Sequence, residues 1–264
     1  MQKKLLIPIL VVLLLVIVLM VRGCGNKDAS QDDKQDETQD VQTDTFDNTN
    51  TTGNDVRTEL GTMTANESGG VDITVTADGP QTTYTYTDVA PDAWYADAVN
   101  YVVSTGVMSG DEDQNLFRPE YGVERSQFAV IMYRFAGGTP TAAEASFSDL
   151  TGDEWYYEYV KWMVGKGLMG GNGGAFDPGG FLSCEQALIV LYRLAGEPAI
   201  TGTLEDYPYA PKVSASGKDA VTWAWNSGLI TEKECVWYPT QAVSRAQVAL
   251  LLMRYDTLIG RNAA

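Results

Sequence analysis

The chain has 264 residues, a formal net charge of −17 at pH 7 and no histidine. We do not expect a nucleic-acid partner, because phosphate-backbone binding needs clustered Lys and Arg. The absence of histidine removes the commonest general base and most zinc sites, so we expect neither an enzyme nor a metal or cofactor site. Catalysis by paired carboxylates alone stays open as an alternative.

Residues 1–24 have the pattern of an export signal. A positively charged start is followed by an uncharged apolar run of 17 residues, Leu5 to Val21. The run ends at Gly23-Cys24, which resembles the lipobox of bacterial lipoproteins, where the cysteine carries lipid; Arg22 departs from that pattern. The run is also just long enough for an uncleaved transmembrane anchor. In either case the basic start favours an inside N-terminus, so the rest of the chain lies outside the membrane.

Residues 25–81 are expected to form a disordered acidic linker. Residues 25–55 carry nine acidic and two basic side chains, and Phe46 is their only aromatic residue. Such a segment cannot bury enough apolar area to offset its chain entropy. Residues 71–75 alternate like a strand, but a lone strand is not a domain, so we interpret residues 56–80 as a spacer.

The remaining sequence repeats itself with a period near 60 residues. Trp94-Tyr95 recurs 61 positions later as Trp155-Tyr156, and an aromatic residue stands eight positions before Arg125, Cys184 and Arg245. The copies span roughly 86–138, 147–197 and 206–258, within domains at 82–143, 144–201 and 202–264.

Each copy reads as two helices joined by a turn-rich loop. The first helix of each copy is expected to end at a glycine: Gly106, Gly167 and Gly228. The second carries an apolar stripe at i, i+3, i+4 and i+7, formed by Phe128, Ile131, Met132 and Phe135, by Ala187, Val190, Leu191 and Leu194, and by Val248, Leu251, Leu252 and Tyr255. These stripes predict a shared helical core.

A short motif precedes each second helix: residues 123–127 (Val-Glu-Arg-Ser-Gln), 182–186 (Leu-Ser-Cys-Glu-Gln) and 243–247 (Val-Ser-Arg-Ala-Gln). With the upstream segments 86–89 and 147–150, it resembles the S-layer homology (SLH) domain family. The resemblance is specific in the first two copies, whereas the third is assigned mainly by spacing. It implies an all-α, pseudo-threefold unit of three two-helix repeats that binds secondary cell-wall polysaccharide, often pyruvylated, in grooves between neighbouring repeats.

The arginines of the motif are the leading candidates for ligand binding. Ser183 with Gln186, and Ser244 with Gln247, fit a capping box that only starts a helix. Arg125 and Arg245 do not fit that account, because the helix dipole disfavours a cation in the first turn, and a guanidinium suits a carboxylate partner. A structural ion pair between Arg125 and Asp88 is the alternative.

Six other residues are candidates through the resemblance: Asp88, Trp94, Gly110, Asp149, Trp155 and Gly171. Both Trp residues favour a core position over a sugar platform, and both glycines could be turn glycines. The first copy alone keeps Asp88, Trp94, Gly110 and a motif Arg together, so we expect its groove to bind best. Cys184 cannot supply the arginine contact; it either pairs with Cys235 or is a buried small hydrophobe.

We therefore expect a non-catalytic cell-envelope protein that ties the membrane to a wall polysaccharide. The alternatives are a surface carbohydrate-active enzyme that uses paired carboxylates, and a module that binds an envelope protein.

Overall fold

The computed structural model describes residues 60–76 and 80–260 of the chain. In chain order the elements are the strands β1 (Thr62–Ala65), β2 (Val71–Val75) and β3 (Thr82–Tyr86), the helices α2 (Ala96–Ser104), α3 (Arg125–Phe135), α4 (Tyr157–Gly165) and α5 (Cys184–Leu194), the 3-10 turn η1 (Ala210–Lys212), and the helices α6 (Lys218–Asn226) and α7 (Arg245–Leu258). The expected signal or anchor at 1–24, with Cys24, and the linker up to residue 59 lie outside these residues. Within the described part, no helix is long and apolar enough to cross a membrane.

A small antiparallel sheet stands where the sequence predicted only a spacer. Its order is β1-β2-β3, so β2 is central. Val71 and Ile73 of β2 are fully buried, and β2 packs on α2. The Gly61 N–H donates to Ser104 Oγ of α2 at 2.9 Å. The expected all-α fold and the linker boundary at residue 81 are therefore wrong for residues 62–76, because the alternating segment finds two Thr-rich partner strands.

The expected two-helix copies are confirmed, with most of the predicted stripe buried. Helices α2, α4 and α6 end two residues before Gly106, Gly167 and Gly228, whose φ angles of +67°, +68° and +76° lie in the left-handed region. That conformation suits glycine and lets the chain turn sharply into the following loop.

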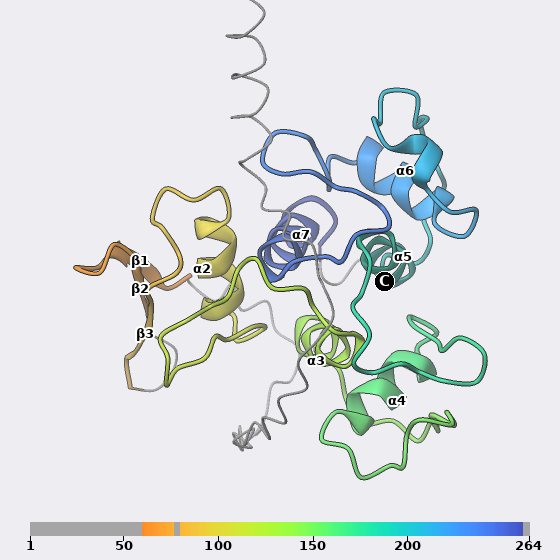
Figure 1. Ribbon diagram of the computed structural model, residues 1–264, viewed down its shortest axis with the longest axis horizontal. Coiled ribbons are helices and arrows are strands. Elements are labelled where there is room, and N and C mark those ends of the chain that lie inside the picture. The colour runs from red at the N-terminus through yellow and green to blue at the C-terminus, as the bar shows by residue number, and fades with distance from the viewer. Residues whose placement is uncertain (1–59, 77–79, 261–264) are drawn as a thin grey trace, which may run out of the picture. The chain divides into compact units, whose positions relative to one another are not determined.

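The helices of different copies interlock. Figure 1 shows α3, α5 and α7 end-on at the centre, with α2, α4 and α6 around them. The main helix contacts join α2 to α7, α3 to α4 and α5 to α6, so each outer helix packs on the inner helix of the preceding copy. Aromatic pairs mark two of these contacts: Tyr133 with Trp162 at 5.5 Å, and Tyr192 with Trp223 at 5.6 Å between ring centroids.

Three main-chain hydrogen bonds close a ring through the segments that precede α3, α5 and α7. The Val123 N–H donates to the Val243 carbonyl at 3.0 Å, Val243 donates to Leu182 at 2.8 Å, and Leu182 donates to Val123 at 2.9 Å. Each copy donates one bond and accepts one, so the pseudo-threefold arrangement implied by the SLH resemblance is present in the backbone itself.

Candidate binding site

The motif before each inner helix forms the expected capping box. Ser183 Oγ accepts from the Gln186 N–H at 3.3 Å, and Ser244 Oγ accepts from the Gln247 N–H at 3.2 Å, while each Gln side chain accepts from the serine N–H. The next two N–H groups of each helix donate to carbonyls of a neighbouring copy; Arg125 and Ser126 donate to Gly180 and Pro178. Helix initiation is thus coupled to contact between copies.

Arg125 reaches across to the second copy. Its Nε donates to the Phe176 carbonyl and its Nη2 to the Gly170 carbonyl, both at 2.7 Å. Its guanidinium carbon lies 4.8 Å from the centre of the Phe176 ring, within cation–π range. Arg125 makes no ion pair with Asp88. Its structural partners are instead the two main-chain carbonyls of the second copy. We call the contact between the first and second copies junction 1/2.

Arg245 makes the same contact with the first copy, at junction 3/1. Its Nε donates to the Phe117 carbonyl at 2.8 Å and its Nη2 to the Ser109 carbonyl at 2.6 Å. The guanidinium carbon lies 4.7 Å from the Phe117 ring. Burial lowers the pKa of Arg245 to about 10, so it remains a cation at neutral pH.

These contacts place each predicted arginine beside the loop of another copy rather than beside that of its own. Arg245, not Arg125, adjoins the turn of Asp88 and Gly110, whereas Arg125 adjoins the turn of Asp149 and Gly171. The first copy therefore does not bring its own motif arginine to its own loop, because each set combines an arginine from one copy with a loop of the next. Sequence spacing could not reveal this exchange, because it does not say which copy an arginine faces. Which junction binds best stays a prediction.

Asp88 and Asp149 hold the loops to which the arginines bind. Asp88 accepts from the N–H groups of Phe117 and Arg118 at 2.8 and 2.7 Å. Asp149 accepts from Phe176 and Asp177, both at 2.7 Å. These main-chain donors hold the pKa of Asp149 below its usual value. The aspartates therefore fix the carbonyls that receive the guanidinium groups.

Gly110 and Gly171 lie so close to neighbouring atoms that there is no room for a Cβ at either position. A Cβ at Gly110 would overlap the Leu116 carbonyl and the Tyr86 ring, and a Cβ at Gly171 would overlap the Ala175 carbonyl and the Phe147 ring. Each glycine lies against the aromatic residue at the start of its own copy, Tyr86 for Gly110 and Phe147 for Gly171. The Gly110 N–H also donates to Tyr86 Oη at 3.2 Å.

Trp94 and Trp155 precede helices α2 and α4 and differ in burial, since Trp94 packs against the core. Trp94 is half-buried, and Trp155 is 51% exposed, so the core interpretation is wrong for Trp155. Trp155 packs edge-on against Tyr156. Burial raises the pKa of Tyr156, and the carboxylates of Glu154, Asp149 and Glu124 add to the shift. Because Glu124 belongs to the first copy, this aromatic pair lies near junction 1/2.

Junction 2/3 uses other chemistry. Cys184 stands in place of the arginine and is buried, and burial raises the pKa of its thiol to about 12. Cys184 forms no disulfide, so the small-hydrophobe interpretation describes it better. The Tyr207 hydroxyl donates to the Trp237 carbonyl, the position that a guanidinium takes at the other two junctions. Sequence reasoning missed this role, although Tyr207 aligns with Tyr86 and Phe147.

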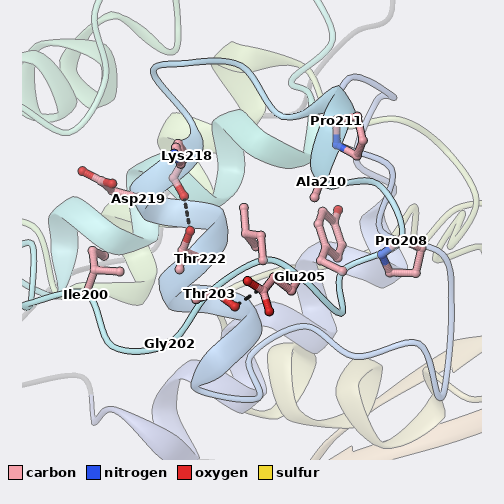
Figure 2. A pocket seen from close by; sticks show the side chains of 12 residues that line it. Ile200, Gly202, Thr203, Glu205, Pro208, Ala210, Pro211, Lys218, Asp219 and Thr222 are labelled. Atoms are coloured by element: carbon pink, nitrogen blue, oxygen red, sulfur yellow. Dashed lines mark hydrogen bonds between the residues drawn. The ribbon is translucent and has the colours of Figure 1, made fainter.

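A surface cavity of about 760 Å³ opens beside Tyr207 in the third copy (Figure 2). Its lining includes Leu204, Glu205, Lys218 and Asp219. Figure 2 shows Asp219 pointing away from Glu205, so this cavity does not bring the two carboxylates together as a glycosidase would require. Among residues 60–76 and 80–260, no group of His, Cys, Asp or Glu could hold a metal ion.

Comparison with known families agrees with this architecture. Residues 85–129 and 146–188 match the family model of the S-layer homology domain. Two segments of the chain are therefore similar to the S-layer homology domain. Both matched segments run from the opening aromatic residue into the inner helix and so contain Arg125, Asp88 and Asp149. The third copy lies beyond the matched segments, although its helices complete the ring.

The chain is also similar to surface proteins of bacteria. The chain is 28% identical to the S-layer protein sap of Bacillus anthracis over 208 residues, which is 77% of this chain and 25% of that protein. It is 26% identical to an S-layer protein of Bacillus thuringiensis subsp. finitimus, with 77% and 25% covered. Cell surface glycoprotein 1 of Acetivibrio thermocellus is 22% identical over 59% of this chain and 7% of its own length. The chain thus spans about a quarter or less of these relatives.

Proposed function

We propose that this protein is a non-catalytic cell-surface protein that attaches to a wall polysaccharide through the junctions between its SLH copies. The observation that supports the proposal most directly is the combination of an arginine and a tightly turned glycine loop at both junctions 1/2 and 3/1, with the exposed Trp155 near junction 1/2. The names of the relatives place similar segments in S-layer and cell-surface proteins.

The chemistry of these junctions suits an acidic sugar. Arg125 uses Nε and Nη2 for carbonyls, which leaves Nη1 without a hydrogen-bond partner within the described part of the chain. A guanidinium edge of this kind can bind a carboxylate such as that of a pyruvate ketal. The exposed face of Trp155 offers a surface on which a sugar ring can stack. The family's wall polysaccharide is therefore the ligand class that we propose.

Co-sedimentation tests this proposal. The full-length chain, purified in mild detergent, is mixed with cell-wall sacculi that are intact, stripped of their attached polysaccharide, or digested with protease. We expect sedimentation with intact and protease-treated sacculi and its loss with stripped sacculi. Trp155→Ala should weaken sedimentation, whereas Leu258→Ala, which removes an equally exposed side chain at the end of α7, should not.

The alternative functions give other results. A module that binds an envelope protein would lose its target on protease treatment. A carbohydrate-active enzyme would release reducing sugars from the sacculi over time. Either result, or equal sedimentation with stripped and intact sacculi, would contradict the proposal.

We also propose that the N-terminal segment fixes the protein to the outer face of the cell membrane, so that it links membrane and wall. If Cys24 is lipidated, Cys24→Ala should abolish labelling by a radioactive fatty acid and leave an unprocessed precursor. A wild-type protein that carries no lipid and begins at Met1 would instead favour a transmembrane anchor.

A further inference from the structure

The three junctions differ in charge at one equivalent position. Arg118, Asp177 and Tyr238 each lie between an aromatic residue and a proline, at residues 117–119, 176–178 and 237–239. In the first two copies the backbone is the same: φ is +59° at both Arg118 and Asp177, and each N–H donates to the aspartate of its own copy at 2.7 Å. The fold therefore presents a cation in one copy and an anion in the next at the same place.

At junction 3/1, Arg118 adds a second guanidinium next to Arg245. Its Nη2 forms an ion pair with Asp111 Oδ2 at 2.9 Å and donates to Gln114 Oε1 at 3.1 Å. Its guanidinium carbon lies 5.5 Å from the centre of the Tyr121 ring. Nε and Nη1 have no hydrogen-bond partner among residues 60–76 and 80–260, and the side chain is 27% exposed. Arg118 is thus held in place with two donor groups still available.

Junction 1/2 carries an anion, Asp177, in place of Arg118. Burial lowers the pKa of Arg125, and the charges of Asp177 and Asp149 oppose that shift. Junction 2/3 has Cys184 and Tyr238 at these two positions, and Tyr238 packs against Tyr209 with ring centroids 5.0 Å apart. An anionic ligand therefore finds one guanidinium but no second cation at the Arg118 position of junction 1/2, and no guanidinium at these positions of junction 2/3.

We propose that junction 3/1 is the site that takes the carboxylate substituent of the wall polysaccharide, and that Arg118 determines this choice. The inference rests on the proposed function. Arg118 and Arg245 together offer cationic donors to an acidic sugar on a chain whose net charge is −17. Planar guanidinium groups bind carboxylates in a bidentate manner, which adds geometric selectivity to the attraction between charges.

Isothermal titration calorimetry of the full-length chain in detergent tests the role of Arg118. The probes are wall-polysaccharide fragments in native form and after chemical reduction of their carboxylates to alcohols. Arg118→Asp places the residue of the second copy in the first. We expect about tenfold to hundredfold weaker binding of native fragments, the range for loss of a charge-assisted hydrogen bond, and less than about threefold change for reduced fragments.

Lys166→Asp is the matched control, because it makes the same change in net charge at the exposed C-terminal end of α4. Native affinity that is unchanged in Arg118→Asp, or reduced equally in Lys166→Asp, would overturn the inference while leaving the proposed function intact. Failure of the wild-type chain to bind either probe would overturn the proposed function itself. If Arg118→Asp does not fold, as judged by circular dichroism, Asp177→Arg decides: tighter binding of native fragments alone supports the inference, and no change overturns it.

Discussion

Arg245 joins the last helix to the first copy through two hydrogen bonds to carbonyls that lie 128 and 136 positions earlier in the chain. We expect Arg245→Ala to lower the free energy of unfolding by about 1.5–3 kcal/mol, because two hydrogen bonds from a charged group are lost and the Phe117 and Ser109 carbonyls lose that donor. Urea denaturation followed by tryptophan fluorescence measures the change. Lys166→Ala removes an exposed cation and should shift the midpoint little; an Arg245→Ala midpoint equal to that of the wild type would show that these bonds contribute nothing to stability.

Two adjacent glycines provide a sharper test of the loop geometry. A Cβ at Gly171 would overlap the Ala175 carbonyl and the Phe147 ring, whereas nothing lies within 4 Å of a Cβ at Gly170. Gly171→Ala should therefore destabilise the protein by about 1–3 kcal/mol, as overpacking does, and Gly170→Ala should have almost no effect. Thermal melts of both variants give the comparison. Similar melting temperatures would mean that the loop relaxes freely.

The sequence pointed to residues that meet at the junctions but not to their partners, and their role in ligand binding stays a prediction. Arg125 and Arg245 begin α3 and α7, whereas Asp88, Asp149, Gly110 and Gly171 lie outside the helices and strands. The copy that each arginine faces depends on how the ring closes, which no spacing within one copy records. The charge difference between Arg118 and Asp177 was visible in the sequence, but its meaning required the positive φ angle that the two residues share.

At the scale of elements, substitutions in the sheet test how much it contributes to the stability of the first copy. Ile73 is fully buried on β2, so Ile73→Ala should lower the free energy of unfolding by about 2–5 kcal/mol, the usual range for such a truncation in a core. Thr82→Ala, at an exposed position of β3, should change it by less than about 0.5 kcal/mol. Chemical denaturation measures both. Equal, small effects would indicate that the sheet is only loosely attached to α2.

The helices were predictable and the sheet was not, for a physical reason. Helices α3, α5 and α7 carry apolar side chains at a period that their own sequences display. Strand β2 alternates clearly, but β1 and β3 are mostly threonine and polar, and they bury only one side chain fully, Tyr86. Their strand conformation comes from pairing with β2, an interaction that a local pattern does not reveal.

At the scale of the whole molecule, the interlocked helices predict that the three copies unfold together. Each outer helix packs on an inner helix of another copy, so a single copy lacks the partner of both its helices. A chain that ends at residue 205 loses α6 and α7 and leaves α2 and α5 uncovered. We expect it to lose cooperative unfolding in urea and the near-ultraviolet circular dichroism of its packed aromatic residues. A sharp transition at the wild-type midpoint would show that the first two copies are independent of the third.

The ring of main-chain bonds has a further consequence for the order of events when the chain is made. The first copy is synthesised long before the last, but its helix α2 packs on α7. The Tyr101 hydroxyl of α2 also donates a hydrogen bond to Asp256, which lies 155 positions later in the chain. Such distant closure slows folding, because the intervening chain must first be brought together. Helix α2 of the first copy therefore lacks its packing partner until α7 has been synthesised. Junction 3/1 comes into existence only with the final helix, so a prematurely terminated chain would lack this site even if its first two copies were intact in sequence.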